Sequence, residues 1–314
     1  MTKTVLVTGA SGFIGAAMVR ALAKEGFKVR AASREPTAVR PRDGVASVAL
    51  PDLKGPVDWR PLLEGVSHVV HLAGIAHSPG TLADDIYMRV NAAAAGELAV
   101  AARGRVERLV LISSVRAQAG LSSDHILTET DTSEPTEAYG RSKLEAERLV
   151  AASGVPFTVL RPAVVYGRGV KGNIASLATL ARTPMPLPFA GLDNRRSLLA
   201  LENLAAAISL VLTSERAIGE TFLVADDEPI SVGNMVAAMR EGLGRPPGLV
   251  RVPQGAVKRL MASFGKEAEW ERLAGSFVID AGKLRGIGWR AAMKTPEGLA
   301  RMMRSSDGNG ATPV

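Results

Sequence analysis

The feature that most constrains this chain is a glycine-rich turn that joins an apolar run at residues 5–7 to a helix-like stretch at residues 16–25. A strand, such a turn and a helix in succession place a dinucleotide pyrophosphate on free backbone N–H groups at the helix N-terminus. Gly9 permits the tight turn, Gly12 permits close approach of a phosphate, and Gly15 lets the helix pack on the strand. The spacing is GxxGxxG and not GxGxxG. The remaining cofactor contacts expected from this turn are Ser11, Phe13 and Ile14.

Strand-like runs alternate with helix-like runs through the first half of the chain. The expected strands lie at residues 5–7, 28–32, 47–50, 67–72, 108–112 and 157–160, and the expected helices at 16–25, 88–103 and from about 139. This alternation predicts an α/β fold, a Rossmann-type doubly wound parallel sheet covered by helices on both faces. We expect residues 1–165 to form the nucleotide-binding domain, with residues 193–217 returning to it. Residues 166–304 are expected to form mostly a smaller substrate-binding domain, and residues 305–314 a disordered tail.

The composition narrows the class of protein. The 314 residues are 46% hydrophobic and include no cysteine, which removes thiolate metal sites and cysteine nucleophiles and favours a cytoplasmic protein. No run approaches the ~18 apolar residues of a membrane helix, so no membrane partner is expected. The net charge of +7 comes from scattered arginines. We therefore expect no nucleic acid partner, and the charge indicates either a mildly basic surface or an anionic substrate. The histidines, which lack metal-ligand spacing, are His68, His71, His77 and His125, so no metal is expected.

The end of the second expected strand bears on the choice of cofactor. An acidic residue there would hold the ribose 2′-hydroxyl of NAD. This chain instead has Ser33 and Arg34, and a hydroxyl with a guanidinium suits a 2′-phosphate, so NADP is favoured and NAD is the alternative. Asp52 and Leu53 follow the third strand, where Asp52 is positioned to accept a hydrogen bond from the adenine amino group.

A tyrosine and a lysine four residues apart, Tyr139 and Lys143, lie on one face of a helix-like segment. A lysine ammonium at this spacing lowers the pKa of the phenol and can hydrogen-bond the nicotinamide ribose. A tyrosine tuned in this way exchanges a proton with an alcohol or a carbonyl while hydride moves to or from nicotinamide. Ser113 and Ser114 follow the strand at residues 108–112. One of these two hydroxyls is expected beside the cofactor, where it can hydrogen-bond the substrate oxygen.

Together these motifs resemble the extended short-chain dehydrogenase/reductases, the family of sugar-nucleotide epimerases, dehydratases and reductases. The resemblance covers nearly the whole chain and is more specific for the family than for the substrate. The segments that carry it are TGASGFIG (8–15), HLAG (71–74), Asn91 in VNAAAAG, SS (113–114), YGRSK (139–143), RPAVVYG (161–167), Asn173, RRSLLALENL (195–204) and Gly288-Trp289.

The resemblance implies roles for individual residues. Tyr139 is implied as the acid/base and Lys143 as its partner, and Asn91, counted with the cofactor site, supports the catalytic helix. The other implied cofactor contacts are Leu72, Ala73, Gly74, Pro162, Val164 and Val165. The implied substrate contacts are Asn173 and Arg196 on a diphosphate, and Leu187 and Phe189 on a uracil or thymine base. A planar guanidinium also suits a diphosphate physically.

The serine pair resembles a subgroup of UDP-sugar C4 reductases and epimerases, whose SSIKVN segment is similar to SSVRAQ here. In that register the catalytic, substrate-contacting hydroxyl is Ser114, with Ser113 as the second choice, and Arg116 lies near the site. Dehydratases of the family carry an adjacent Asp-Glu pair after this hydroxyl, whereas this chain has Val115 and Arg116. Dehydration of that type is therefore not expected.

The resemblance implies an NAD(P)-dependent oxidoreductase that acts at C4 of a nucleotide sugar, with reduction of a UDP-linked 4-keto sugar as the leading hypothesis. Its product would feed surface polysaccharide synthesis. A UDP-glucose 4-epimerase type of activity is the alternative and uses the same residues. A non-catalytic NADP-binding sensor or scaffold is a further alternative, although such a protein would be expected to lose Tyr139 or Lys143. A homodimer through the helices at residues 88–103 and 139–152 is also implied.

Overall fold

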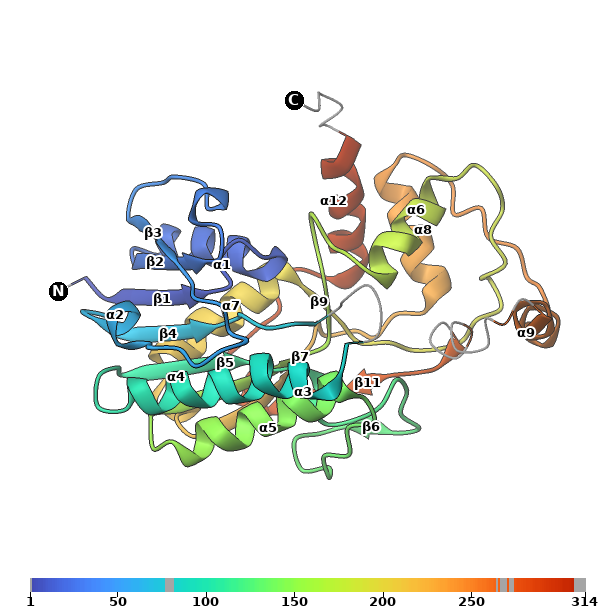
Figure 1. The fold of residues 1–314 in the computed structure, drawn as a ribbon. Helices are drawn as coiled ribbons and strands as arrows, with labels where there is room; N and C mark the ends of the chain where they lie inside the picture. Colours follow the sequence, from blue (N-terminus) through green and yellow to red (C-terminus); the bar gives the residue numbers. More distant parts are fainter. Residues whose placement is uncertain (1, 77–81, 264, 266–269, 271–273, 308–314) are drawn as a thin grey trace.

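The structure, a computed structural model, describes residues 2–76, 82–263, 265, 270 and 274–307. Its centre is a seven-stranded parallel sheet in the order β10-β7-β5-β4-β1-β2-β3 (Figure 1). The predicted Rossmann-type α/β fold is therefore confirmed. The strands of this sheet are β1 (Thr4–Thr8), β2 (Lys28–Ser33), β3 (Val45–Ala49), β4 (His68–His71), β5 (Arg108–Ile112), β7 (Phe157–Pro162) and β10 (Glu220–Val224).

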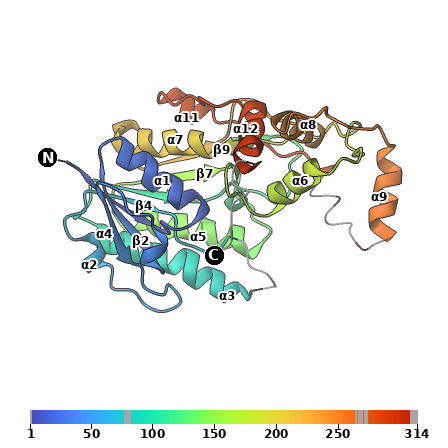
Figure 2. The same ribbon diagram turned by 90° about the horizontal axis from the view of Figure 1, so that it is seen from above.

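Helices cover both faces of the sheet because its strands are apolar on both sides. Along β1, Val5 and Val7 point into one core and Leu6 points into the other. Figure 2 shows α1 (Phe13–Lys24) and α7 (Leu201–Thr213) on one side of the sheet. The opposite side carries α2 (Arg60–Leu63), α4 (Ala94–Ala102) and α5 (Ala138–Ala152). The carboxyl ends of β1 and β4 meet where the strand order reverses, which is the ligand-binding crevice of such sheets.

The helix expected at residues 88–103 is longer and less regular than predicted. It begins as α3 (Asp84–Tyr87), continues as a π-helical turn, η2 (Met88–Ala93), and ends as α4. The π-helical turn contains Asn91, and such turns often occur at functional sites.

A smaller unit lies beyond the carboxyl edge of the sheet, on the right in Figure 1. Its core is formed by α6 (Asn173–Arg182), α8 (Val232–Gly242) and α12 (Thr295–Asp307). Two short parallel pairs, β8 (Val164–Tyr166) with β9 (Leu198–Ala200) and β6 (Ile126–Leu127) with β11 (Val278–Ile279), lie between the units. The other short helices are η1 (Pro36–Ala38), η3 (Val115–Ala117), η4 (Glu215–Ala217), α9 (Gln254–Ser263) and α11 (Gly282–Gly286).

The two units interleave more than the sequence indicated. β10 pairs with β7 at the edge of the main sheet, and α11 contributes Leu284 to the same core, although both lie within residues 166–304. Residues 305–307, assigned to the disordered tail, continue α12, and residues 308–314 lie outside the described residues. Across the described part of the chain, none of the helices combines the length and apolarity that a bilayer crossing demands.

Candidate functional site

The glycine turn is built so that side chains cannot occupy it. Gly9 has a positive φ of 70°, and a Cβ there would lie 2.9 Å from the backbone nitrogen of Ala73. A Cβ on Gly15 would lie 2.1 Å from the carbonyl oxygen of Gly9. Within α1, which the structure describes in full, the first turn carries neither a capping side chain nor an acidic residue. The backbone N–H groups of this turn are therefore arranged to receive an anion, and the fit to a dinucleotide pyrophosphate is good.

A buried threonine joins this turn to the segment after β4. The Thr8 hydroxyl oxygen accepts hydrogen bonds from the backbone N–H groups of Leu72 and Ala73, both at 3.2 Å. Its own proton therefore goes to Nδ1 of His71, which lies 2.8 Å away. Burial lowers the pKa of His71 to about 3, so the ring is neutral with its proton on Nε2. His71 thus has a structural role beside the cofactor crevice.

Two hydroxyls meet at the carboxyl end of β2, next to the glycine turn. The side-chain oxygens of Ser11 and Ser33 lie 2.6 Å apart, and Ser33 is buried. Arg34 is exposed beside them. Asp52 is exposed and accepts from the backbone N–H of Lys54, whereas Leu53 is buried in the core. The strand end therefore offers hydroxyls and a guanidinium to an adenosine ribose.

Tyr139, Ser114 and Arg116 converge at the start of α5. The Ser114 hydroxyl and the Arg116 guanidinium both lie near enough to the phenol to lower its pKa. Burial outweighs them, so the pKa of Tyr139 is raised above its usual value. Arg116 thus exerts on the phenol the kind of charge effect that the sequence analysis assigned to Lys143, whose own effect on the phenol stays a prediction. Tyr87 packs edge-on against the Tyr139 ring, with centroids 6.5 Å apart.

Lys143 lies one turn beyond Tyr139 and is buried. Its Nζ donates to the carbonyl oxygen of Ile112 at 2.8 Å, at the end of β5. Burial lowers the pKa of Lys143 to about 8, against the opposing charge of Glu147. A Cβ on Gly74 would lie 3.8 Å from this Nζ and 2.7 Å from Oδ1 of Asn91. Only a glycine therefore fits between the lysine and the asparagine.

Asn91 ties the cofactor side of the site to the catalytic helix. Its Oδ1 accepts from the backbone N–H of Ile75 at 2.7 Å, and its Nδ2 donates to the hydroxyl of Ser142 at 3.0 Å. The Ser142 hydroxyl in turn donates to the carbonyl oxygen of Tyr139 at 2.8 Å. These bonds connect the segment after β4 with the first turn of α5, and the supporting role that the resemblance implies for Asn91 stays a prediction.

The two serines after β5 have different partners. Ser114 faces Tyr139, whereas the Ser113 hydroxyl donates to the buried carboxylate of Glu147. Glu147 also forms an ion pair with Arg161 at 2.6 Å, and Arg161 donates to Gln118 at 3.0 Å. The sequence analysis did not identify Glu147 or its ion pair with Arg161. The one available signal was the position of Glu147, four residues after Lys143 on the same helix.

The segment expected against the nicotinamide ends β7 and continues into β8. Pro162 is buried at the strand end, Val165 is half-buried, and Val164 is 49% exposed. The backbone N–H of Ala163 donates to the carbonyl oxygen of Val224 at 2.9 Å. This bond fixes the segment at the carboxyl edge, where Val164 and Val165 remain accessible.

On the substrate side, Arg196 is half-buried and donates to the carbonyl oxygen of Gly275 at 2.7 Å. Burial and the charge of Arg116 lower its pKa. Arg116 forms an ion pair with Glu137 at 2.6 Å. Arg116 and Arg196 thus lie close enough to repel each other electrostatically, although Glu137 balances the charge of Arg116.

The structure does not gather the other predicted substrate residues around Arg196. Asn173 is exposed at the first position of α6, after Gly172 with a φ of 67°. Leu187 and Phe189 are 6% and 7% exposed and pack in the core of the smaller unit. Their side chains support the segment from within, so only its backbone and the half-buried Pro188 are open to a nucleobase.

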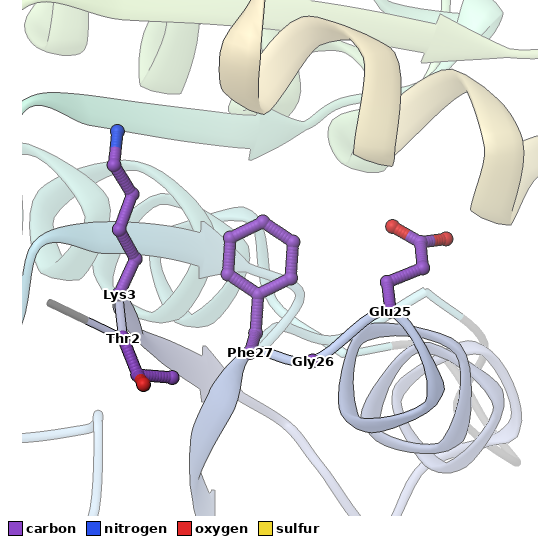
Figure 3. A pocket seen from close by; sticks show the side chains of 5 residues that line it. All are labelled: Thr2, Lys3, Glu25, Gly26 and Phe27. Atoms are coloured by element: carbon purple, nitrogen blue, oxygen red, sulfur yellow. The ribbon is translucent and has the colours of Figure 1, made fainter.

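Two surface hollows of the molecule lie away from this site. One, of about 410 Å³, is lined by Lys3, Glu25 and Phe27 at the amino edge of the sheet, opposite the crevice (Figure 3). The other, of about 260 Å³, lies between α1 and α7. Among the residues that the structure describes, no group of three or more His, Asp or Glu side chains is arranged to hold a metal ion; His77 is outside them.

The chain is similar to a family model, to curated proteins and to solved structures. The model of the NAD dependent epimerase/dehydratase family matches residues 5–225. UDP-glucose 4-epimerase of Vibrio cholerae is 33% identical, and the match covers 95% of this chain and 94% of that protein. The 2'-dehydrokanamycin reductase of Streptomyces kanamyceticus is 29% identical over 89% of this chain and 78% of its own. The structure of MoeE5 in complex with UDP-glucose and NAD has a TM-score of 0.75 and 25% identity, with 98% of this chain and 100% of that chain covered.

Proposed function

The chain belongs to the NAD dependent epimerase/dehydratase family, and from that premise we propose that it oxidises or reduces C4 of a UDP-linked sugar, with Tyr139 as acid/base. The observation that carries this proposal is the convergence of Tyr139, Ser114 and Lys143 at the carboxyl edge of the sheet, beside the glycine turn. A nicotinamide cofactor supplies the hydride chemistry when bound. The backbone N–H groups of Phe13 and Ile14, in the uncapped first turn of α1, would hold its pyrophosphate.

The phenol of Tyr139 moves the proton. In reduction of a 4-keto sugar it donates its proton to the developing O4 alkoxide, and in oxidation of the alcohol it receives that proton. The Ser114 hydroxyl lies near the phenol, whose pKa it lowers, and from there it would polarise the C4 carbonyl. Arg116 and the protonated Lys143 favour the phenolate that forms after proton donation.

Arg196 and Arg116 support a diphosphate-bearing substrate. Their mutual repulsion is relieved by an anion, and a planar guanidinium pairs with a phosphate in two hydrogen bonds. The structure of MoeE5 is described in complex with UDP-glucose, which is a ligand of this chemistry. A reductase of small uncharged ketones has no need for two such groups.

Reduction with NADPH is our first choice. It is supported by the strand end of β2, where Ser11 and Ser33 meet and where Arg34 is exposed. A carboxylate at this position would repel a 2′-phosphate, whereas these groups accept one. The second candidate is a UDP-glucose 4-epimerase type of activity with tightly held NAD. The 33% identity to such an epimerase over 95% of the chain favours it.

The test begins with the purified protein. Bound nucleotide is released and identified by mass spectrometry, and the emptied protein is titrated with NADPH and NADH. A site that is filled by NAD supports the epimerase, and a site that prefers NADPH supports the reductase. Turnover is then assayed with 4-keto UDP-sugars and with UDP-glucose.

Tyr139→Phe provides the residue-level test on the same assays. We expect cofactor affinity to stay within about threefold and turnover to fall by 10² to 10⁴, the range for loss of a general acid. Tyr87→Phe, which removes a hydroxyl from the neighbouring ring, is the matched control and should retain turnover. Turnover that survives in Tyr139→Phe would contradict the assignment.

Assembly as a homodimer and a place in the cytoplasm remain predictions. Val100 is 65% exposed on α4, the helix that packs against α5, which is consistent with a partner on that face. Size-exclusion chromatography with light scattering measures the mass directly.

A further inference from the structure

We propose that Glu147 is a positioning residue whose carboxylate is the buried counter-charge of the Lys143 ammonium, held in place by Arg161 and Ser113. This inference rests on the proposed function, in which Lys143 must be charged to favour the phenolate of Tyr139. It assigns to the buried ion pair a role in the reaction in addition to its role in the fold.

The spacing on α5 places both charged side chains on the buried face of the helix. Lys143 and Glu147 are four residues apart, so their side chains emerge on one face of the helix, with the lysine amino-terminal. Each residue is only 7% exposed. Water therefore screens their interaction weakly.

Other groups fix the carboxylate firmly. Nε of Arg161 donates to Oε1 and Oε2 of Glu147 at 3.0 and 3.2 Å, and Nη2 donates to Oε2 at 2.6 Å. The Ser113 hydroxyl donates to Oε1. Nη1 of Arg161 donates to Oε1 of Gln118 at 3.0 Å. Both oxygens of the carboxylate are thus satisfied, and the side chain is held in one orientation.

This network joins the three elements that carry the site. Ser113 precedes Ser114 at the end of β5, Glu147 belongs to α5, and Arg161 precedes Pro162 at the end of β7. Stability alone is a poor reason for such a pair, because apolar residues of similar volume often replace a buried ion pair without loss of stability. A requirement for charge at Lys143 explains why a carboxylate stands there.

The electrostatic environment of Lys143 depends on few other charges. Burial lowers its pKa to about 8, and Glu147 is the group that opposes this effect. His71 of β4 is neutral at working pH, since its pKa is about 3. The elements packed against α5 also carry Tyr87, Asp85, Arg89 paired with Glu97, Asp84 paired with Arg141, and Arg116 paired with Glu137.

Loss of the Glu147 charge should change the pKa of Lys143 in a definite direction. Lys143 is charged below its pKa, so the ammonium is present up to about pH 8 and is lost above it. Removal of the Glu147 charge lowers that pKa further, and Arg161, left without its counter-ion, acts in the same direction. The alkaline limb of the activity profile should therefore move to lower pH.

The main test is Glu147→Gln, which keeps the shape of the side chain and removes its charge. Lys143 is followed by NMR in protein labelled with ¹³C-lysine, and its resonance is identified by its loss in Lys143→Arg. We expect its titration midpoint to fall by on the order of one pH unit. The alkaline limb of kcat should shift by a similar amount. Glu145→Gln, on the exposed side of α5, is the matched control and should move neither.

Two further variants keep the inference testable if Glu147→Gln folds poorly. Glu147→Asp retains the charge and should restore most of the titration midpoint. The double variant Glu147→Met with Arg161→Met replaces the pair by apolar side chains and should fold, with Lys143 still titrating at lower pH than in the wild type. An unchanged Lys143 midpoint in any folded variant that lacks the carboxylate overturns the inference.

The NMR readout needs no substrate, so it separates this inference from the proposed function. A shifted midpoint without turnover of any UDP-sugar leaves the counter-charge in place and refutes the proposed function. An unshifted midpoint with normal turnover refutes the counter-charge and leaves the proposed function in place.

Discussion

The helix α5 and the segment after β5 approach each other closely at Gly140, directly after Tyr139. A Cβ built on Gly140 would lie 2.2 Å from the carbonyl oxygen of Arg116 and 3.0 Å from Cβ of Pro135. Gly140→Ala therefore forces α5 away from η3. We expect this substitution to impair turnover much more than it impairs folding.

The changes in stability and in kcat expected for Gly140→Ala can be estimated from the contact between its Cβ and the carbonyl oxygen of Arg116. The Cβ falls about 0.8 Å short of the 3.0 Å below which such contacts essentially do not occur. A helix position gains about 1 kcal/mol when alanine replaces glycine, and overpacking against backbone costs about 1–3 kcal/mol. The net loss of stability is thus on the order of 1 kcal/mol. A displacement approaching 1 Å between Tyr139 and Ser114 can cost about 10²-fold in kcat.

The assay combines urea unfolding with steady-state kinetics on the same protein preparation. Gly286→Ala is the matched control, because it is also a helix glycine, and a Cβ there meets nothing within 4 Å. It should leave kcat unchanged and stability equal or slightly higher. The reasoning would be refuted if Gly140→Ala gained stability like this control and kept its kcat, since α5 would then not be in contact with Arg116.

Three other substitutions test neighbouring parts of the site. Gly15→Ala, whose Cβ would lie 2.1 Å from the Gly9 carbonyl oxygen, should weaken binding of NAD and NADPH at least tenfold in isothermal titration; unchanged affinity would contradict the close packing of the turn. Ser114→Ala should lower kcat by about 10²-fold, as for loss of one polarising donor. Ser113→Ala, which removes a bond to buried Glu147, should mainly lower stability by about 1–3 kcal/mol in urea unfolding. The opposite pattern for the two serines would exchange their roles.

The fold was predictable because its signals are local. The apolar run before Gly9 and the glycines after it specify a strand, a turn and a helix within about fifteen residues, and the alternation that follows specifies a parallel sheet. β10 was missed because Glu220–Val224 is short and follows a segment of irregular pattern. It joins the sheet through pairing with β7, some sixty residues earlier in the chain, and local pattern does not report such pairing.

The candidate site was predictable to the extent that its residues share one element. Tyr139 and Lys143 could be paired because a helix fixes the spacing between them. The Glu147–Arg161 ion pair and the Arg116–Glu137 ion pair depend on how α5 packs on β7 and η3, so no spacing rule shows them. Leu187 and Phe189 have a pattern that suits both a nucleobase surface and a core, and the structure places them in the core.

The distinction between reductase and epimerase depends on residues remote from the proton-transfer chemistry. Both activities require Tyr139 to exchange a proton with O4, so the geometry around that phenol is the same for either. A reductase must release its oxidised cofactor after each turnover, whereas an epimerase must retain it while the keto sugar turns over. Retention is determined by the total binding energy of the cofactor, to which, under the proposed function, the hydrogen-bonded hydroxyls of Ser11 and Ser33 would contribute. A Ser33→Asp substitution acts on that contact without touching Tyr139, and it should shift preference from NADPH toward NADH, because a carboxylate binds a ribose 2′-hydroxyl and repels a 2′-phosphate. If that substitution left the preference unchanged, the strand end of β2 would not select the cofactor, and the argument for the reductase would lose its structural basis.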